Sequence, residues 1–282
     1  MKRGLVLEGG AMRGLYTCGI IDVMMENDIW PDGVVGVSAG AAFGCNYKSR
    51  QPGRAIRYNM RFAHDSRYSG LCSFITTGNY INAEFCYHTV PQVYDPFDNN
   101  TFEQNPMEFY VVCTDVETGK PVYKRLDKVD ESTYEWIRAS SSMPIATKVV
   151  SLEGKKMLDG GVTDSIPLEY FERIGYDRNI VILTQTLGYQ KTHTRLVPFL
   201  RMTMPKYPKL VEAMDRRYCM YNGQLDYVRK AELEGRCLVL RPDEDLDVWY
   251  ITHNPKTMHR LYQAGRLIGK KYLEDIKRFY EI

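Results

Sequence analysis

The stretch VVGVSAG, residues 34–40, places Ser38 between two glycines directly after a short apolar run. A buried strand that ends in a sharp turn and opens into a helix would carry the Ser38 hydroxyl at the tip of the turn. Gly36 supplies permissive backbone before the bend, and Gly40 leaves the hydroxyl uncrowded. The pattern is typical of a nucleophile elbow, in which a serine attacks an acyl carbonyl. Taken alone, it also fits a glycine-rich turn with an incidental serine.

Strands and helices alternate on both sides of this turn. Residues 5–7 and 34–37 predict buried strands, residues 15–26 predict a helix, and a helix of small residues begins at Ala39. We expect further core strands at residues 109–114 and 179–184, a hairpin partner at 121–126, a helix at 131–139 and a short strand at 155–158. The order strand, helix, strand, helix indicates an α/β fold with three α/β/α layers around a mainly parallel sheet.

The rest of the chain divides into two kinds of sequence. Residues 50–105 mix aromatic residues, Asn, Gly and Pro without a long periodic run, which is typical of irregular structure with short helices over an active site. After Gly188, apolar residues recur at steps of three or four over 206–230 and 257–280, with a short edge strand expected at 237–240. We therefore expect a catalytic domain at 1–188 and a mainly helical C-terminal region at 189–282 packed on it.

Charge is distributed unevenly along the 282 residues. Residues 190–282 contain 18 Lys and Arg against 12 Asp and Glu, although the whole chain has a formal net charge of only +2. A basic C-terminal third could attract anionic lipid or nucleic acid, but solvated helix faces are the simpler explanation, and we expect no nucleic-acid partner. No window approaches the ~18 apolar residues of a membrane-spanning helix. We expect a soluble protein with at most peripheral membrane contact.

The seven cysteines are scattered along the chain without C-x-x-C spacing, at Cys18, Cys45, Cys72, Cys86, Cys113, Cys219 and Cys237. This pattern predicts neither a disulfide framework nor a zinc site. Reduced cysteines in apolar surroundings favour a cytoplasmic location. We expect no metal and no organic cofactor, and no feature of the sequence indicates an oligomeric state.

A glycine-rich loop, Gly9-Gly10-Ala11-Met12-Arg13-Gly14, follows the first predicted strand and opens a helix. Successive backbone N–H groups and the helix dipole favour an anion at such a place. A Walker A loop needs Lys and then Ser or Thr after its last glycine, whereas Leu15 and Tyr16 follow here. A dinucleotide-binding loop needs a third glycine at position 11, where this chain has alanine. The loop is better interpreted as an oxyanion hole.

A serine nucleophile also needs a proton acceptor. The five histidines, His64, His88, His193, His253 and His259, do not lie in glycine-framed loops at strand ends, and we interpret them as surface or packing residues. Asp159 follows an apolar strand end and precedes Gly160 and Gly161, which leave its carboxylate unhindered. A partly desolvated carboxylate can accept the serine proton directly. A lone Asp-Gly-Gly turn is common, but the two other elements favour a base.

Four segments together, EGGAMRG (8–14), GVSAG (36–40), RASSSMPIA (138–146) and LDGGVTDSIPL (158–168), resemble the patatin-like phospholipases in sequence and order. These lipid acyl hydrolases use a Ser–Asp dyad on a three-layer sandwich. The resemblance implies Ser38 as nucleophile, Asp159 as base, N–H donors at Gly9, Gly10 and Ala11, and Arg13 as cationic support. The remaining motif positions are Gly14, Gly36, Gly40, Gly160 and Gly161.

The sequence departs from the family pattern in two places. Glu8 stands where Asp is frequent, and Ala11 stands where a third glycine is usual. An alanine at position 11 would be strained if that position requires positive φ, so which amides form the oxyanion hole depends on the backbone conformation there.

The resemblance implies hydrolysis of lipid or phospholipid acyl esters through an acyl-enzyme. An acyltransferase or thioesterase would use the same dyad with another acceptor or leaving group. A regulatory lipid-binding protein with weak chemistry would bind anionic vesicles without hydrolysing them, and a nucleotide-binding protein fits the motifs least.

Overall fold

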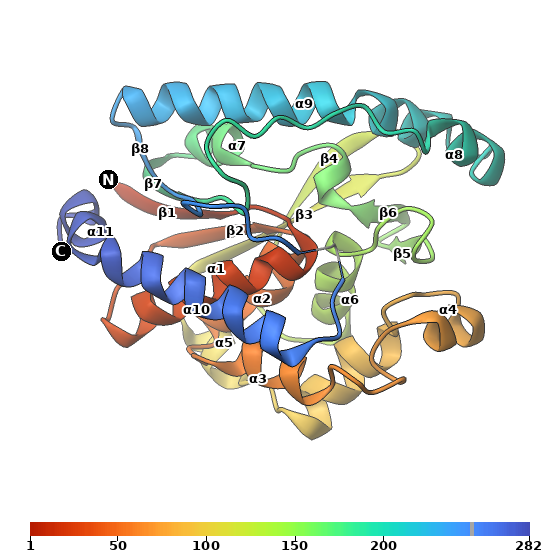
Figure 1. Ribbon diagram of the computed structural model, residues 1–282, viewed down its shortest axis with the longest axis horizontal. Coiled ribbons are helices and arrows are strands. Elements are labelled where there is room, and N and C mark those ends of the chain that lie inside the picture. Colours follow the sequence, from red (N-terminus) through yellow and green to blue (C-terminus); the bar gives the residue numbers. More distant parts are fainter. Residues whose placement is uncertain (249–250) are drawn as a thin grey trace.

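The computed structural model describes residues 1–248 and 251–282, and in these residues eight strands form one sheet (Figure 1). Its spatial order is β5 (Val150–Leu152), β6 (Lys155–Asp159), β3 (Glu108–Asp115), β2 (Gly33–Val37), β1 (Lys2–Leu7), β7 (Tyr176–Ile182) and β8 (Cys237–Leu240), with β4 (Lys120–Arg125) paired to β3. Strands β3, β2, β1, β7 and β8 run parallel, whereas β4, β6 and β5 form antiparallel pairs. The expected mainly parallel sheet is confirmed.

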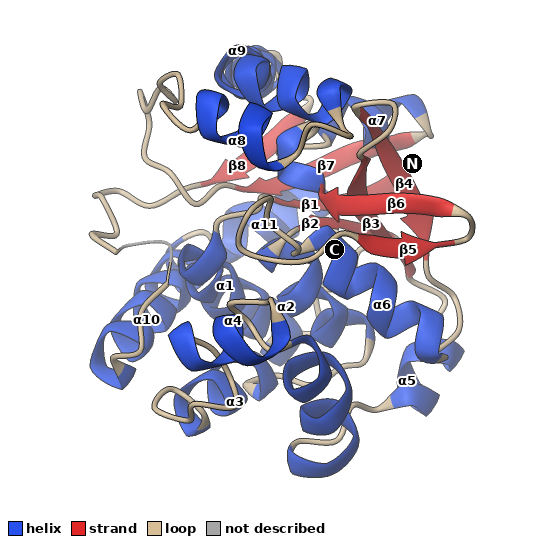
Figure 2. Ribbon diagram, turned by 90° about the vertical axis from the view of Figure 1, so that its right-hand side faces the viewer, coloured by secondary structure: helices blue, strands red, loops and turns tan. Residues whose placement is uncertain are grey.

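Helices cover both faces of the sheet, as Figure 2 shows from the side. One face carries α7 (Leu168–Arg173), α8 (Val197–Thr203) and α9 (Pro208–Leu233). The other carries α1 (Gly14–Glu26), α2 (Ala39–Lys48), α3 (Arg54–Arg61), α4 (Leu71–Thr77), the π-helix η2 (Phe85–Tyr94), α5 (Asn99–Gln104), α6 (Glu131–Ser140) and α10 (Pro255–Lys271). The chain therefore has the expected three α/β/α layers.

Side-chain alternation along the central strands separates two cores. Leu5 and Leu7 of β1 face the core that contains α1, α2 and α10, whereas Val6 faces the core that contains α7 and α9. In the same way, Val34 and Val35 of β2 point to opposite faces. Because successive strand residues point to opposite sides, fully buried strands have near-continuous apolar sequences, which made these two strands predictable.

The C-terminal residues belong to the same sheet and helical layers. Strand β8 pairs in parallel with β7, and α10 packs against α1. The prediction of one continuous helix over 257–280 is wrong, because α10 ends before Tyr272, where the chain turns and continues as a separate helix, α11 (Leu273–Tyr280). The turn lets Tyr280 reach the sheet, where its hydroxyl donates to the carbonyl oxygen of Gly4 at 2.6 Å. The domain boundary near residue 188 stays a prediction.

None of the helices in the described part of the chain combines the length and the apolar character needed to cross a membrane.

Candidate active site

Ser38 occupies the sharp turn between the end of β2 and the start of α2. Its φ of 54° and ψ of −121° are rare for a residue with a side chain, and such strain is typical of functional turns. A Cβ atom at Gly36 would lie 2.4 Å from the Gly40 carbonyl oxygen, and one at Gly40 would lie 2.5 Å from that of Leu7. Both flanking glycines are therefore required by close backbone approach.

Asp159 ends β6, which pairs antiparallel with only the last three residues of β3, so that Asp159 lies opposite Cys113. Because Val112 pairs with Val37 of β2, this places Asp159 beside Ser38. The Ser38 hydroxyl donates to Asp159 Oδ2 at 2.6 Å, and the Gly161 amide donates to Oδ1 at 2.7 Å. Burial raises the pKa of Asp159, while the Ser38 hydrogen bond and the Arg217 charge oppose that rise. The carboxylate is thus a stronger base than a solvated aspartate, and it lies in position to take the Ser38 proton.

Three consecutive serines of the 138–146 segment connect the backbone of Ser38 to that of Asp159. The Ser140 hydroxyl accepts the Ser38 amide at 3.1 Å, and the Ser141 hydroxyl donates to the Ser38 carbonyl oxygen at 3.0 Å. The Ser142 carbonyl oxygen accepts the Asp159 amide at 2.8 Å. Sequence reasoning used this segment only as a motif, and the structure adds that it holds the backbone at both Ser38 and Asp159.

The glycine-rich loop runs from the end of β1 through the short 3-10 turn η1 (Ala11–Arg13) and lies against Ser38. A Cβ at Gly9 would come within 3.0 Å of the Ser38 Cβ. In the part of the chain that the structure describes, the amides of Gly9 and Gly10 donate to no protein acceptor. Unpartnered amides beside a nucleophile are what an oxyanion hole requires. Gly14 begins α1, and Gly160 and Gly161 form the short turn after Asp159.

Ala11 has a φ of 48°, in the left-handed region that favours glycine. We expect Ala11→Gly to raise the free energy of unfolding by up to about 1 kcal/mol, because it removes a strain of ~1–2 kcal/mol and adds a smaller entropy cost. Chemical denaturation measures this, with Ala213→Gly in α9 as the control. There a helical alanine is lost, and stability should fall by about 1 kcal/mol. A loss at position 11 as large as at position 213 would contradict the strain.

Glu8 is buried beneath the loop and joins three elements. Its carboxylate accepts hydrogen bonds from Thr184, just after β7, and from the Tyr221 hydroxyl on α9. Burial raises the pKa of Glu8 above its usual value. The longer side chain of Glu8, compared with the aspartate frequent at this position, thus spans from the loop to α9.

Three cationic side chains line the small cavity that also contains Ser38 and Asp159, namely Arg13, Lys191 and Arg217. Arg217, on α9, donates from Nε to the Gly161 carbonyl oxygen at 2.6 Å. Lys191 lies 4.5 Å from the centre of the Tyr221 ring, and burial together with the Arg217 charge lowers the pKa of Lys191 to about 8. Sequence reasoning missed Lys191 and Arg217, since neither belongs to a motif.

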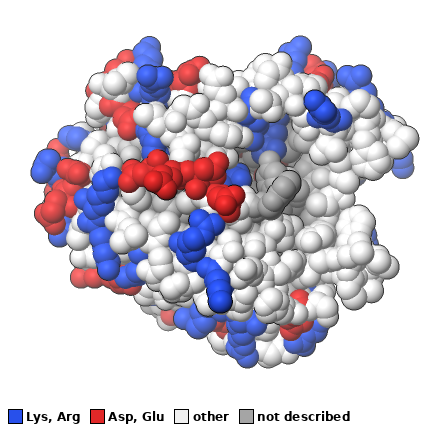
Figure 3. Space-filling model, in the orientation of Figure 1, with Lys and Arg blue, Asp and Glu red and all other residues white. Residues whose placement is uncertain are grey.

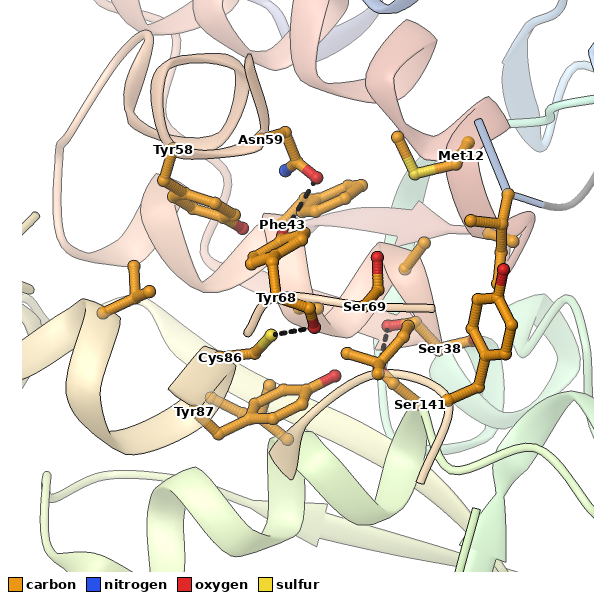
Figure 4. A pocket seen from close by; sticks show the side chains of 18 of the residues that line it. Met12, Ser38, Phe43, Tyr58, Asn59, Tyr68, Ser69, Cys86, Tyr87 and Ser141 are labelled. Carbon is orange, nitrogen blue, oxygen red and sulfur yellow. Dashed lines mark hydrogen bonds between the residues drawn. The ribbon is translucent and has the colours of Figure 1, made fainter. Parts of the chain in front are cut away.

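A second, largely apolar pocket opens on the other side of Ser38 (Figure 4). Figure 4 shows Ser38 and Met12 on one side of it and Tyr58 and Cys86 on the other. Its other apolar walls come from α2, η2, α6, α10 and the loop that follows η2, and include Phe43, Tyr87, Val90, Phe97, Ile137 and Met258. A pocket of this composition fits a hydrocarbon chain.

The structure gives each of four histidines a partner other than Ser38. His88 contacts Glu135, His193 contacts Asp215, and His259 contacts Gln263. His253 lines the apolar pocket, with its Nδ1 2.9 Å from the Ala63 carbonyl oxygen. Within residues 1–248 and 251–282, no group of His, Cys, Asp and Glu is arranged to hold a metal ion.

The chain matches two family models and is similar to several known proteins. The family model for patatin-like phospholipase matches residues 5–172, more than half of the chain, and a domain of unknown function (DUF6363) matches residues 207–281. Lysophospholipase nte1 of Aspergillus fumigatus is 27% identical over 97% of this chain. This chain spans only 18% of that protein's length.

This chain covers a larger share of two other proteins to which it is similar. The uncharacterised protein YjjU of Escherichia coli is 28% identical, over 96% of this chain and 77% of its own length. The crystal structure of VipD from Legionella pneumophila aligns with a TM-score of 0.46 and 12% identity, covering 97% of this chain and 67% of that one.

Proposed function

The chain belongs to the patatin-like phospholipase family, and we infer from this that it hydrolyses acyl esters of lipids through a dyad of Ser38 and Asp159. One observation carries the inference, the 2.6 Å hydrogen bond from the Ser38 hydroxyl to a buried carboxylate beside an apolar pocket. Asp159 would take the proton as Ser38 Oγ attacks the ester carbonyl, and the amides of Gly9 and Gly10 would stabilise the oxyanion. Arg13 supplies positive charge nearby.

The reaction then proceeds through an acyl-enzyme. Protonated Asp159 returns its proton to the departing alcohol oxygen, which leaves the acyl group on Ser38. A water molecule attacks the acyl-enzyme while Asp159 accepts a proton from it, and collapse of the second intermediate releases the fatty acid and restores the Ser38 hydroxyl. The chain's own residues supply every proton acceptor and donor in this sequence.

The two pockets suggest how a substrate lies. The acyl chain would occupy the apolar pocket, and an anionic alcohol part would lie near Lys191 and Arg217. We therefore propose a phospholipid or lysophospholipid as substrate, which agrees with the lysophospholipase name of the fungal relatives. Residues 189–282 would then serve the catalytic part by supplying these two cations. The seven cysteines are all free thiols, in keeping with a cytoplasmic location.

A fluorophosphonate probe tests the inference directly. We expect the probe to label the purified protein on the peptide that contains Ser38, and lysophosphatidylcholine to protect against labelling while releasing free fatty acid. Absence of both labelling and fatty-acid release would refute the proposed function. Labelling at another residue would reassign the nucleophile.

The charge of Arg217 predicts a shift in the pH dependence. Asp159 must be ionised to act as base, so the acid limb of kcat/KM reports its pKa, which burial raises above the usual value of an aspartate. Arg217 opposes that rise, so Arg217→Gln should move the acid limb to higher pH. Activity would then fall most in acidic solution.

The matched control is Arg216→Gln, because Arg216 is the exposed neighbour on the same helix. Arg217→Lys keeps the charge and should restore most of the acid limb. An unshifted acid limb in Arg217→Gln would show that this residue acts only on structure.

A further inference from the structure

Helix α4 presents large apolar side chains to solvent. Leu71 is 68% exposed, Phe74 38% and Ile75 74%, although side chains of this type are usually buried. The stretch from residue 68 to residue 83, which contains this helix, has no Asp, Glu, Lys or Arg. Ser69 and Ile81 form a bridge at the base of the helix, and both line the apolar pocket. The helix is therefore anchored next to the pocket wall, but Leu71, Phe74 and Ile75 point to solvent and do not line the pocket themselves.

Helix α8 and the residue before it present a second such group. Leu196 is 53% exposed, Phe199 44% and Met202 70%. Residues 185–211, which surround them, contain five Lys and Arg and no Asp or Glu. Asp215 and Glu212 of α9 pair with Arg201 and Lys209, whereas Arg195 and Lys206 have no ion-pair partner in the described residues. This segment is both apolar and basic.

The two groups lie on the same edge of the molecule. In Figure 1, α8 is at the upper right and α4 at the lower right, and both face the viewer in Figure 2. Figure 3 shows the surface hollowed between these two regions, with uncharged atoms over the lower one. We name the six side chains Leu71, Phe74, Ile75, Leu196, Phe199 and Met202 the docking rim.

We propose that the docking rim binds the surface of an anionic lipid bilayer. The rim side chains enter the acyl-chain boundary of the bilayer, while the basic residues beside α8 contact anionic headgroups. A lipid molecule then passes from the bilayer into the apolar pocket past Ser69 and Ile81. This inference rests on the proposed function for its purpose, but vesicle binding itself needs no chemistry at Ser38. The absence of acidic residues over 185–211 favours an anionic surface over a second copy of the chain.

The test uses the full-length chain with Ser38→Ala, so that the vesicles stay intact. Sedimentation with vesicles of phosphatidylcholine and phosphatidylglycerol measures binding, and pure phosphatidylcholine vesicles should bind less. We expect Leu71→Asp with Ile75→Asp to weaken binding roughly tenfold or more, because two apolar side chains leave the lipid and two anions approach it. The control is Leu233→Asp with Leu267→Asp, at positions 82% and 68% exposed on α9 and α10, which should leave binding unchanged.

The charge contribution is tested with a second pair. Arg195→Gln with Lys206→Gln should weaken binding to the anionic vesicles roughly tenfold, whereas Arg229→Gln with Lys230→Gln, exposed at the far end of α9, should not. With Ser38 restored, the rim variants should hydrolyse a soluble short-chain ester at the unmodified rate.

Three results would overturn the proposal: equal loss of binding in test and control pairs, no loss in either, or dimerisation of the Ser38→Ala chain that Leu71→Asp with Ile75→Asp abolishes. The last would assign the rim to a second copy. A failure of the proposed function would appear separately, as absent hydrolysis with vesicle binding intact.

Discussion

Replacing Ser38 with alanine is expected to lower fatty-acid release by roughly 10³-fold or more, since no acyl-enzyme can form. The change removes one oxygen atom and the hydrogen bond to Asp159. Alanine at this position keeps the same strained backbone, so the fold should be retained. Fatty-acid release from a phospholipid, measured together with thermal unfolding, checks both expectations.

A graded control comes from the neighbouring segment. Ser141→Ala removes the hydrogen bond to the Ser38 carbonyl oxygen and the one with the Tyr87 side chain, but leaves Ser38 and Asp159 in place. Its activity should therefore fall by no more than roughly tenfold, the equivalent of about 1.4 kcal/mol. If Ser38→Ala retained most of the wild-type rate while folded, the nucleophile would have to be another residue.

The parts of the site that consist of residues close together in the sequence could be predicted from the sequence alone. The apolar run before Ser38 and the glycines around it specify a strand, a tight turn and a helix, and the structure contains each of them. The glycine-rich loop was identified in the same way. The proximity of Asp159 to Ser38 could not be predicted from local spacing, because the two residues are 121 positions apart in the sequence. Only an antiparallel strand inserted beside β3 brings the two together.

Features that depend on tertiary packing could not be predicted from the sequence. Arg217 reaches the site because α9 packs over the sheet, and Lys191 does so because its backbone is hydrogen-bonded to Asn222 of the same helix. Neither residue has a sequence signature. Of the hairpin formed by β5 and β6, only β6 was predicted from the sequence. Glu153 and Gly154, both with positive φ, form the turn between the two strands. The exposed apolar groups of α4 and α8 were also missed, since periodicity does not distinguish an unpartnered apolar face from a buried one.

Ala11 illustrates how a departure from a family pattern can be tested structurally. The sequence predicts strain at Ala11 if position 11 has positive φ, and the φ of Ala11 is indeed 48°. The loop therefore keeps the backbone path of a glycine with an alanine side chain. Ala11 lines both the apolar pocket and the small cavity that contains Arg13, Lys191 and Arg217.

In the proposed mechanism Asp159 is the only base, which makes Asp159→Asn the most informative single change. The amide is nearly the same shape and its oxygen can still accept the Gly161 amide, but it cannot take the Ser38 proton. We expect turnover to fall by roughly 10³-fold or more, with fluorophosphonate labelling lost in parallel. Stability at neutral pH should not fall. A carboxyl whose pKa is raised in the folded state costs folding free energy above its unfolded pKa of ~3.9, and asparagine removes that cost.

Two controls separate this prediction from its alternatives. Asp164 lies five residues further along the same motif and is also buried, but its carboxylate accepts hydrogen bonds from the side chains of Tyr123 and Gln224. Asp164→Asn should therefore preserve the chemistry of a folded protein. His253→Ala removes the histidine that lines the apolar pocket. If His253→Ala inactivated the protein while Asp159→Asn did not, histidine would be the base, and the Ser38–Asp159 hydrogen bond would be structural.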